Sequence, residues 1–347
     1  MTDTQPALSG ISAARQGRAG IITLDRPKAL NALDLPMVQG MMHVLTQWAD
    51  DPDVDVVVVR STHPKAFCAG GDIRAIRTAS LEGRFEDIHT FFASEYELNC
   101  LIGAYPKPYV ALIDGYCMGG GMGISMHAPH RVVGEGVILA MPETLIGFFP
   151  DVGATHFLPR LADGIGLYLG LTGAHVNAAD AMASGIGTAF VPRTQHEALI
   201  EALAKGEAVD SAIARASEPA PAPSALAEAR PLIAELFANA PSALSIVQIL
   251  ERTSGDFAAQ TLATLRGLSP TSLAITFENI RRGVALSLPD ATALELFLSA
   301  PVTRSADFIE GVRAALVDKD RSPKWQPAML EDVDPATIAA LYAGAPV

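Results

Sequence analysis

The sequence predicts an α/β fold followed by a helical C-terminal region. Two observations support this fold class: strand-like and helix-like segments alternate in the earlier part of the 347-residue chain, and helix-like segments alone follow residue 223. The length permits one large domain or two smaller ones. We therefore expect a core over residues 1–215 and a helical region over residues 216–347.

The first predicted elements form a strand–helix–strand unit. Residues 21–24 and 54–60 are mostly apolar, and the second segment contains the β-branched run typical of buried parallel strands. Between them, residues 35–48 carry apolar side chains at helical spacing, at Val38, Met41, Met42, Leu45 and Trp48. This order predicts two parallel strands joined by a helix.

The pattern then repeats before the chain becomes helical. After a glycine turn at 67–72, residues 85–102 are helix-like and 110–113 strand-like, and short strands are expected at 131–133 and 137–140. The proline-rich stretch 214–223 predicts a linker or extended loop. Helices are expected beyond it at 225–237, 243–252, 258–266, 273–286 and 292–299.

The charge balance argues against a nucleic-acid partner. Twenty-five Lys and Arg residues face 38 Asp and Glu residues, so the net charge of −13 leaves no basic surplus to neutralise phosphates. No apolar run approaches the length of a membrane span, and the first ten residues lack a secretory pattern. We expect a soluble cytoplasmic protein with no membrane partner.

The cysteines and histidines do not predict a metal site. His127 and His130 are three residues apart, but Pro129 between them would break the helix that brings such a pair together. The three cysteines are too scattered for a disulfide framework or a C-x-x-C site; they are Cys68, Cys100 and Cys117. We expect no metal and no cofactor.

The residues most suggestive of chemistry lie between positions 116 and 153. The glycines at 119–121 follow a predicted strand and open a predicted helix, so backbone N–H groups there would approach a ligand and favour negative charge. Glu143 follows amid apolar neighbours, where loss of solvent tunes a carboxylate for acid–base or nucleophilic work. Together these features suggest chemistry at a polarised carbonyl.

A second glycine turn, F-C-A-G-G-D-I, occupies residues 67–73. Two such turns could each offer one N–H to the same oxygen, as in an oxyanion hole, although each could also be a tight turn without a ligand. Three common motifs are absent. The last glycine of G-x-G-x-x-G is replaced by Ile124, the last glycine of G-x-S-x-G is replaced by His127, and no Walker sequence is present.

Three segments resemble the signatures of the crotonase superfamily, which is the enoyl-CoA hydratase/isomerase group: residues 22–33, 66–73 and 107–123. Segments 91–99, 142–153 and 307–327 are similar, within it, to the 3-hydroxyisobutyryl-CoA hydrolases of valine catabolism. The resemblance covers nearly the whole chain and is weakest at 193–270. It implies a spiral of ββα repeats, a helical C-terminal region that covers an acyl pocket, and an acyl-CoA substrate.

The resemblance also implies roles for individual residues. The backbone N–H groups of Gly71 and Gly120 would bind the thioester oxygen. Residues of segments 28–30 and 69–73 would line the path of the pantetheine and adenine of CoA; they include Lys28, Ala69, Asp72 and Ile73.

A missing side chain bears on the reaction. Hydratases of the superfamily carry a second glutamate at the position of Gly123, where this chain has no side chain to hold a water molecule. The carboxylates that the hydrolases use match Glu95, Glu143 and Asp151. We expect Glu143 to drive thioester cleavage, by direct attack or as a general base, while Glu95 and Asp151 orient the 3-hydroxyl group or the water.

Several alternatives stay open. Asp151 could be a helix cap or turn residue, and Glu95 an exposed helical charge. The chain could be an enoyl-CoA isomerase, a hydratase-like enzyme or a non-catalytic acyl-CoA binder, and a hydrolase could also take 3-hydroxypropionyl-CoA. The CoA phosphates need local positive charge, for which Lys28, Arg74, Arg77 or segment 318–324 are candidates. Members of the superfamily are often trimers, so a homo-oligomer is a further expectation.

Overall fold

The computed structural model describes residues 3–4 and 9–347, which form two compact units. The first unit comprises the residues up to Gly71, Glu97–Leu139 and His175–Ala227. The second comprises Asp72–Tyr96, Ala140–Ala174 and Glu228–Val347. The compact units do not follow the expected division at residue 215, because the chain passes between them repeatedly. That division stays a prediction about which part binds acyl-CoA and which part covers the acyl pocket.

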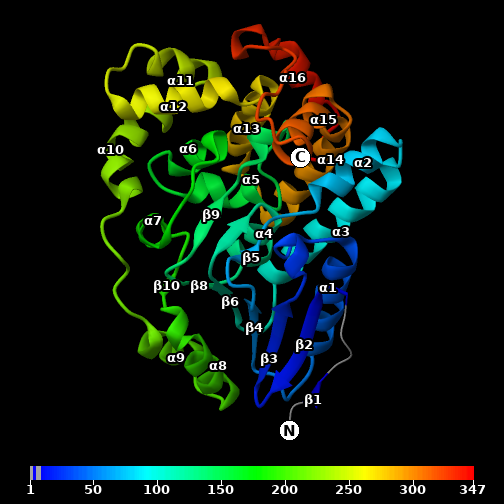
Figure 1. Ribbon diagram of the computed structural model, residues 1–347, viewed down its shortest axis with the longest axis vertical. Coiled ribbons are helices and arrows are strands. Elements are labelled where there is room, and N and C mark those ends of the chain that lie inside the picture. The colour runs from blue at the N-terminus through cyan, green and yellow to red at the C-terminus, as the bar shows by residue number, and fades with distance from the viewer. Residues whose placement is uncertain (1–2, 5–8) are drawn as a thin grey trace. The chain divides into compact units, whose positions relative to one another are not determined.

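A seven-stranded sheet forms the centre of the first unit (Figure 1). Its order is β1-β2-β3-β4-β6-β8-β10, and every pairing from β3 onward is parallel. The predicted parallel pair is confirmed, since Ala19 to Leu24 align with Val56 to Ser61. The strands are β1 (Asp3–Thr4), β2 (Ile11–Gln16), β3 (Ala19–Leu24), β4 (Val56–Ser61), β6 (Tyr109–Ile113), β8 (His130–Val133) and β10 (Ala189–Phe190).

The central strands β3, β4 and β6 are largely buried on both faces of this sheet because their side chains are mostly apolar. One face packs against α8 (His196–Ala204) and α9 (Val209–Ala216), and Ile21, Val58 and Leu199 belong to this buried cluster. At the neighbouring residue Gly20, an added Cβ would point to the other face and lie 2.5 Å from the ring of Trp48 on α1 (Leu35–Ala49). Helices therefore cover the sheet on both sides.

A smaller sheet of three strands carries the glycine turns. Its order is β5 (Ala66–Cys68), β7 (Tyr116–Met118) and β9 (Ile138–Ala140). Strands β5 and β7 are parallel, and each is followed at its carboxyl end by glycines. Parallel pairing therefore brings the two predicted turns to the same edge of this sheet.

The first unit contains one long helix, α1, and several short ones besides α8 and α9. They are η1 (Pro27–Ala29), α1 (Leu35–Ala49), α4 (Gly120–Met126), α7 (Ala178–Ser184) and η4 (Arg193–Gln195). Helix α1 starts where the Asp34 side chain accepts a hydrogen bond from the N–H of Met37 at 3.0 Å. Two helices cross from one unit to the other along the chain, α3 (Phe85–Gly103) and α10 (Ala225–Phe237).

The second unit is helical. Its longer helices begin at serine caps with proline in the first turn: the Ser269 side chain caps α13 (Pro270–Gly283) and the Ser287 side chain caps α14 (Leu288–Thr303). The other helices are α2 (Ile73–Leu81), η2 (Glu143–Ile146), α5 (Ala154–Phe157), η3 (Leu158–Arg160), α6 (Ile165–Thr172), α11 (Ala243–Leu250), α12 (Asp256–Gly267), α15 (Ala306–Val312), the π-helix η5 (Arg313–Val317), η6 (Leu330–Asp332) and α16 (Pro335–Leu341).

Candidate active site

Glu143 lies in the 3-10 helix η2, whose backbone is held by neighbouring elements of the second unit. The Thr144 hydroxyl donates to the carbonyl of Leu171 at 3.2 Å, and the Thr144 carbonyl accepts from the N–H of Ser269 at 3.2 Å. The helix ends at Gly147, which has a φ of 71°. Glu143 is only 7% exposed, so this turn keeps its carboxylate largely out of water.

Asp151 begins a left-handed turn in the same unit. Val152 and Gly153 follow it with φ angles of 52° and 83°. The Asp151 Oδ2 accepts a hydrogen bond from the hydroxyl of Tyr96 at 2.7 Å, and both side chains are buried. Gly153 occupies the cap position of α5, so Asp151 is not the cap of that helix, whereas its place at the turn agrees with the alternative of a turn residue.

Glu95 is buried on α3, with 2% of its surface exposed, so the alternative of an exposed helical charge is wrong. Its Oε1 has no hydrogen-bond partner among the described residues, and neither has Oε2 of Glu143. A buried acceptor without a donor is costly. Two such oxygens in one cluster fit a substrate or water that donates hydrogen bonds.

The carboxylates of this cluster have raised pKa values. Burial, together with the charge of Asp151, raises the pKa of both Glu95 and Glu143 well above the usual range. Burial raises the pKa of Asp151 to about 7, although the hydrogen bond from Tyr96 favours its ionised form. Close carboxylates do not all ionise together, so the cluster holds protons near neutral pH. This behaviour suits acid–base chemistry.

Aromatic rings provide the apolar surroundings. The Phe148 ring stacks on Phe149 at 4.4 Å and on Phe92 at 5.5 Å between ring centroids. Phe308 meets Phe148 edge-on at 5.9 Å, and Phe92 packs beside Tyr96 at 5.7 Å. These rings belong to the second unit and exclude water near the carboxylates, which accounts for the raised pKa values.

Sequence reasoning missed a fourth carboxylate, Glu295 on α14, which is fully buried. Its Oε2 accepts a hydrogen bond from the N–H of Gly153 at 2.7 Å, and its Oε1 accepts one from the N–H of Thr155 at 2.8 Å. Burial and the charge of Asp151 raise the pKa of Glu295 to about 8. One signal in the sequence could have identified Glu295. It lies on the same helical face as the buried Leu298, and a charged residue on a buried face is unusual.

The two glycine turns lie side by side in the first unit. An added Cβ on Gly70 would lie 3.3 Å from the carbonyl oxygen of Met118 and 3.9 Å from the nitrogen of Gly120. Gly71 directly follows Gly70, and Gly120 opens α4, where the first N–H groups have no acceptor within the helix. The structure thus brings the two predicted donors close together, and their role towards an oxyanion stays a prediction.

Two of the predicted CoA-binding segments are also neighbours in the first unit. The N–H of Ala69 donates to the carbonyl of Leu30 at 3.0 Å, and the N–H of Leu33 donates to that of Gly70 at 2.7 Å. Lys28 is exposed on η1, next to this connection along the chain. These contacts place segments 28–30 and 69–71 together, as a shared binding path requires.

The other predicted CoA-binding residues belong to the second unit. Asp72 caps α2 by accepting a hydrogen bond from the N–H of Ala75 at 3.3 Å, and Ile73 is the first residue of that helix. Asp72 therefore has a structural role in addition to the binding role implied by the resemblance.

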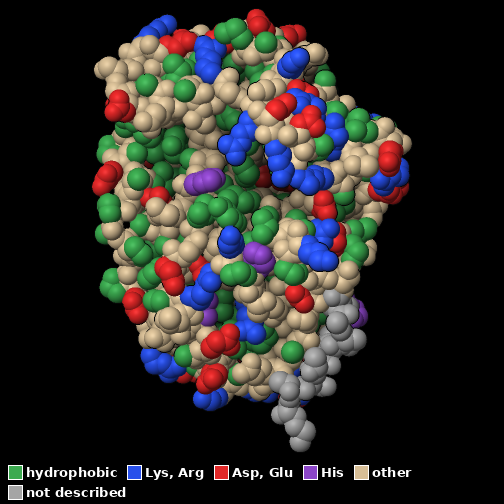
Figure 2. All heavy atoms as spheres, viewed as in Figure 1, with side chains coloured by type: hydrophobic (Ala, Val, Ile, Leu, Met, Phe, Trp, Pro, Cys, Tyr) green, Lys and Arg blue, Asp and Glu red, His purple; other side chains and the backbone are tan. Residues whose placement is uncertain are grey.

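Two predicted phosphate-binding candidates donate to backbone carbonyls. Arg77 Nε donates to the carbonyl of Ile309 at 2.9 Å, and Arg74 donates to the carbonyl of Leu316. Figure 2 shows Lys and Arg side chains mixed with Asp and Glu around α2 and α15. Binding phosphate through the same N–H groups would replace these bonds, so the phosphate role of both residues stays a prediction.

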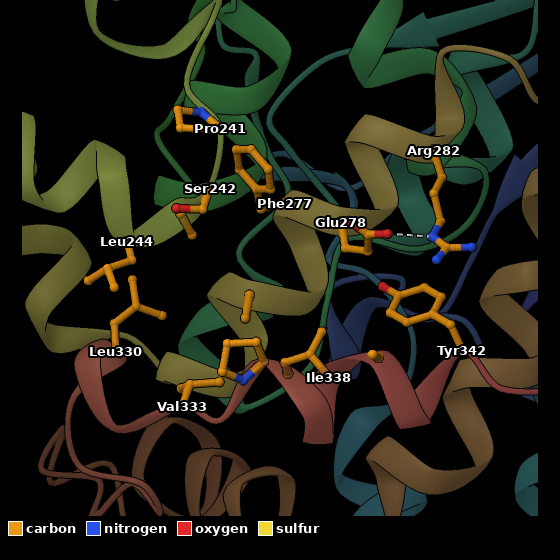
Figure 3. A pocket seen from close by; sticks show the side chains of 14 residues that line it. Pro241, Ser242, Leu244, Phe277, Glu278, Arg282, Leu330, Val333, Ile338 and Tyr342 are labelled. Carbon is orange, nitrogen blue, oxygen red and sulfur yellow. Dashed lines mark hydrogen bonds and ion pairs between the residues drawn. The ribbon is translucent and has the colours of Figure 1, made fainter.

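The second unit also contains a pocket of about 390 Å³ that includes no predicted site residue (Figure 3). Mostly apolar side chains of α11, α13 and α16 line it, among them Phe277 and Ile338. Its charged groups are paired: Arg282 bonds Glu278 at 2.6 Å and lies 4.4 Å above the ring of Tyr342. The residues that line the pocket therefore include none of the buried carboxylates of the cluster.

Within residues 3–4 and 9–347, no three or more His, Cys, Asp or Glu side chains are grouped so as to hold a metal ion. No helix in the described chain combines the length and apolar character needed to cross a membrane.

This chain has counterparts among known proteins. Residues 19–342 match the family described as Enoyl-CoA hydratase/isomerase. The chain belongs to this family. The match includes both glycine turns and all four buried carboxylates, so the resemblance to the crotonase superfamily is confirmed.

Curated relatives in the family share one name, "3-hydroxyisobutyryl-CoA hydrolase, mitochondrial". The Xenopus tropicalis protein is 43% identical over 328 residues, which cover 92% of this chain and 85% of the relative. The Danio rerio protein is 44% identical, with 91% of this chain and 85% of the relative covered. The narrower resemblance seen in the sequence is therefore confirmed as well.

Solved structures of family members confirm the predicted crotonase-like fold. A protein titled carnitinyl-CoA dehydratase from Mycobacterium thermoresistibile aligns with a TM-score of 0.91 and 36% identity over 97% of each chain. A protein titled enoyl-CoA hydratase from Rhodobacter sphaeroides aligns with a TM-score of 0.89 and 41% identity, covering 96% of this chain and 97% of the other.

The expected cytoplasmic location is wrong. The relatives in this enoyl-CoA hydratase/isomerase family are named mitochondrial proteins. The expectation depended on the lack of a secretory pattern and of a membrane span, and neither feature distinguishes one aqueous compartment from another.

Proposed function

We propose that this protein hydrolyses the thioester of 3-hydroxyisobutyryl-CoA, or of a close short 3-hydroxyacyl-CoA, in valine catabolism. One observation carries the proposal: Glu95, Glu143 and Asp151, the three carboxylates implied for the hydrolases, are buried together in one unit. Curated relatives with the hydrolase name, at 40–44% identity over most of the chain, support the same activity.

In the proposed reaction, water adds across the acyl–sulfur bond. The carbon–sulfur bond of the thioester breaks, a carbon–oxygen bond forms to the acyl carbon, and the thiolate of CoA takes up a proton. Glu143 either attacks the acyl carbon, giving a mixed anhydride that water then cleaves, or removes a proton from the attacking water. Both routes need Glu143 in its ionised form.

The other residues stabilise or orient the reacting groups. The Oε1 of Glu95, which lacks a donor in the cluster, would accept a hydrogen bond from the 3-hydroxyl group or the water. Asp151, held by Tyr96, would likewise orient the 3-hydroxyl group or the water. The N–H groups of Gly71 and Gly120 would stabilise the negative charge that develops on the thioester oxygen, an effect worth about 10²–10³ in rate per donor.

Hydration is the main competing reaction, because two structural neighbours are titled as a hydratase and a dehydratase. Gly123 argues against it: it is buried on α4 and provides no carboxylate to activate water at the position used by superfamily hydratases. Isomerisation needs a proton shuttle but has no evident use for the additional buried carboxylates.

The same proposal covers cofactors and partners. CoA enters as part of the substrate, and the chemistry described needs no further cofactor. A homo-oligomer is the assembly that we propose, as members of the superfamily often form trimers.

A thiol assay tests the activity. The purified protein is mixed with 3-hydroxyisobutyryl-CoA and a thiol-specific chromophore, and we expect stoichiometric release of free CoA and 3-hydroxyisobutyrate. With 3-hydroxypropionyl-CoA we expect a lower kcat/KM, because one methyl group in an apolar pocket is worth about 1–3 kcal/mol. Absence of CoA release, with hydration of a short enoyl-CoA in a parallel absorbance assay, would favour the hydratase interpretation.

A further inference from the structure

Glu295 holds the backbone turn that carries Asp151, yet the proposed reaction does not use Glu295 directly. It lies on α14, far along the chain from that turn, and each of its oxygens accepts a backbone N–H. The two donors, Gly153 and Thr155, flank the first residue of α5. A single carboxylate thereby fixes both ends of a three-residue stretch next to Asp151.

The turn needs this support because its backbone conformation is unfavourable for one of its residues. Val152 is β-branched and has a φ of 52°, in the left-handed region that such side chains rarely adopt. Gly153 follows with a φ of 83°. A conformation of this kind persists only where the surroundings enforce it.

Close packing supports the turn from a second side. An added Cβ on Gly283 of α13 would collide with the carbonyl oxygen of Thr155, so α13 and α5 are in direct backbone contact. The single turn α5 cannot maintain itself, since a helix of four residues is far below the length that is stable alone. Its position therefore depends on α13 and on Glu295 of α14.

We propose that Glu295 is a positioning residue which, by clamping the N–H groups of Gly153 and Thr155, aims the Asp151 carboxylate at the substrate. The inference is based on the hydrolysis proposed above. The titratable groups that face this region are Glu95 and Tyr96 on α3, Glu143 on η2, and Asp151 itself. Glu295 acts on the reaction through the geometry of the turn that carries Asp151.

Hydrogen exchange tests the clamp without any activity measurement. Glu295→Gln keeps the length of the side chain and one acceptor oxygen, whereas Glu295→Met keeps only the length. In the peptide that contains residues 151–157, we expect exchange to accelerate on the order of tenfold or more in Glu295→Met and less in Glu295→Gln.

A matched control separates this effect from general loss of stability. Asp307 is also a buried carboxyl that accepts a backbone N–H, from Gln326 at 2.7 Å, but it lies outside the cluster. Asp307→Asn should leave exchange in the 151–157 peptide as in the wild type. Equal exchange of this peptide in wild type and Glu295→Met would overturn the clamp.

Kinetics test the positioning role. For Glu295→Gln we expect kcat to fall about 10- to 100-fold, as a small displacement of a catalytic group can cause, with KM changed less than about twofold. The acid limb of the pH–rate profile should keep its position below about pH 8, because Glu295, with a pKa of about 8, is largely protonated there and is as neutral as the amide. Asp307→Asn should leave kcat as in the wild type.

The outcomes distinguish the two proposals. A wild-type protein that releases no CoA, together with a Glu295-dependent change in exchange, would refute the hydrolase function and retain the clamp. An active Glu295→Gln variant with wild-type kcat would refute the positioning role and leave the hydrolase function intact.

Discussion

The hydroxyl of Tyr96 donates a hydrogen bond of 2.7 Å to Oδ2 of Asp151, and both side chains are buried in the second unit. Burial raises the pKa of Asp151 to about 7, while this bond favours the ionised carboxylate. The phenol of Tyr96 therefore increases the ionised fraction of Asp151 near neutral pH, against the effect of burial.

Replacement of Tyr96 by Phe should move the acid limb of the pH–rate profile to higher pH. The substitution removes the donor and keeps the ring beside Phe92, so the pKa of Asp151 rises further while the packing persists. The lost bond to a charged group is worth about 1.5–3 kcal/mol. Tyr342→Phe provides a control, because Tyr342 is a buried phenol of the same unit that bonds Asn279 instead. Profiles between pH 5 and pH 9 that coincide for wild type and Tyr96→Phe would contradict the assigned role.

Replacement of Glu143 by Gln should lower kcat for CoA release by about 10²–10⁴, the usual contribution of a positioned acid or base. The amide has nearly the same shape but neither attacks carbon nor accepts a proton. Glu97→Gln changes an exposed carboxylate on the same chain and should retain wild-type activity. Full thioesterase activity in Glu143→Gln would exclude Glu143 from the reaction.

The two routes open to Glu143 differ in whether a covalent intermediate forms. Hydroxylamine attacks a mixed anhydride, so the covalent route predicts a hydroxamate on the peptide that contains Glu143 after turnover with substrate. The general-base route predicts an unmodified peptide. Mass spectrometry of digested protein, with Glu143→Gln as the blank, decides between them.

Stability should decrease as the pH rises through the window set by Glu295. Its pKa is about 8 in the folded protein, against about 4.3 in the unfolded chain. Between these pH values the folded state holds a proton that the unfolded state has released, so the free energy of unfolding falls by up to about 1.4 kcal/mol per pH unit. Denaturant unfolding at several pH values from 5 to 8 gives the free energy of unfolding as a function of pH, and this free energy should fall less steeply with pH for Glu295→Gln than for wild type. Equal dependence on pH in the two proteins would mean that Glu295 is ionised throughout.

Replacement of Gly121 by Ala should destabilise the first unit and disturb its glycine pair. The new methyl group would lie 2.5 Å from the carbonyl oxygen of Cys68, so backbone must move, at a cost of about 1–3 kcal/mol. An added Cβ on Gly267 meets no described atom within 4 Å, which makes Gly267→Ala the matched control. Melting temperatures and kcat of both variants check the prediction.

The sequence was most informative where local pattern alone determines the structure. The β-branched run at 54–60 predicted a buried parallel strand, and the stripe at 225–237 coincides with α10. Elements without a clear stripe were missed, such as α6, which is apolar almost all round, and the short α15. Periodicity gives no signal for such segments, because their helical structure depends on packing against the rest of the unit.

The same distinction applies to the site. Glu143 stood out because its apolar neighbours adjoin it in the sequence. The burial of Glu95 could not be predicted, since apolar residues surround α3 on several faces and only tertiary packing selects the buried one. Glu295 contacts residues about 140 positions earlier in the chain, at 153 and 155, and no local pattern reports such a pairing.

The clamp by Glu295 also has a consequence for biosynthesis. A ribosome makes Glu95, Glu143 and Asp151 long before it reaches α14, and at about 5–20 residues per second the delay lasts several seconds or more. A nascent chain that has not reached residue 295 carries every carboxylate named by the family resemblance, yet the Gly153 and Thr155 amides lack their acceptor. The acidic cluster is therefore completed only late in translation.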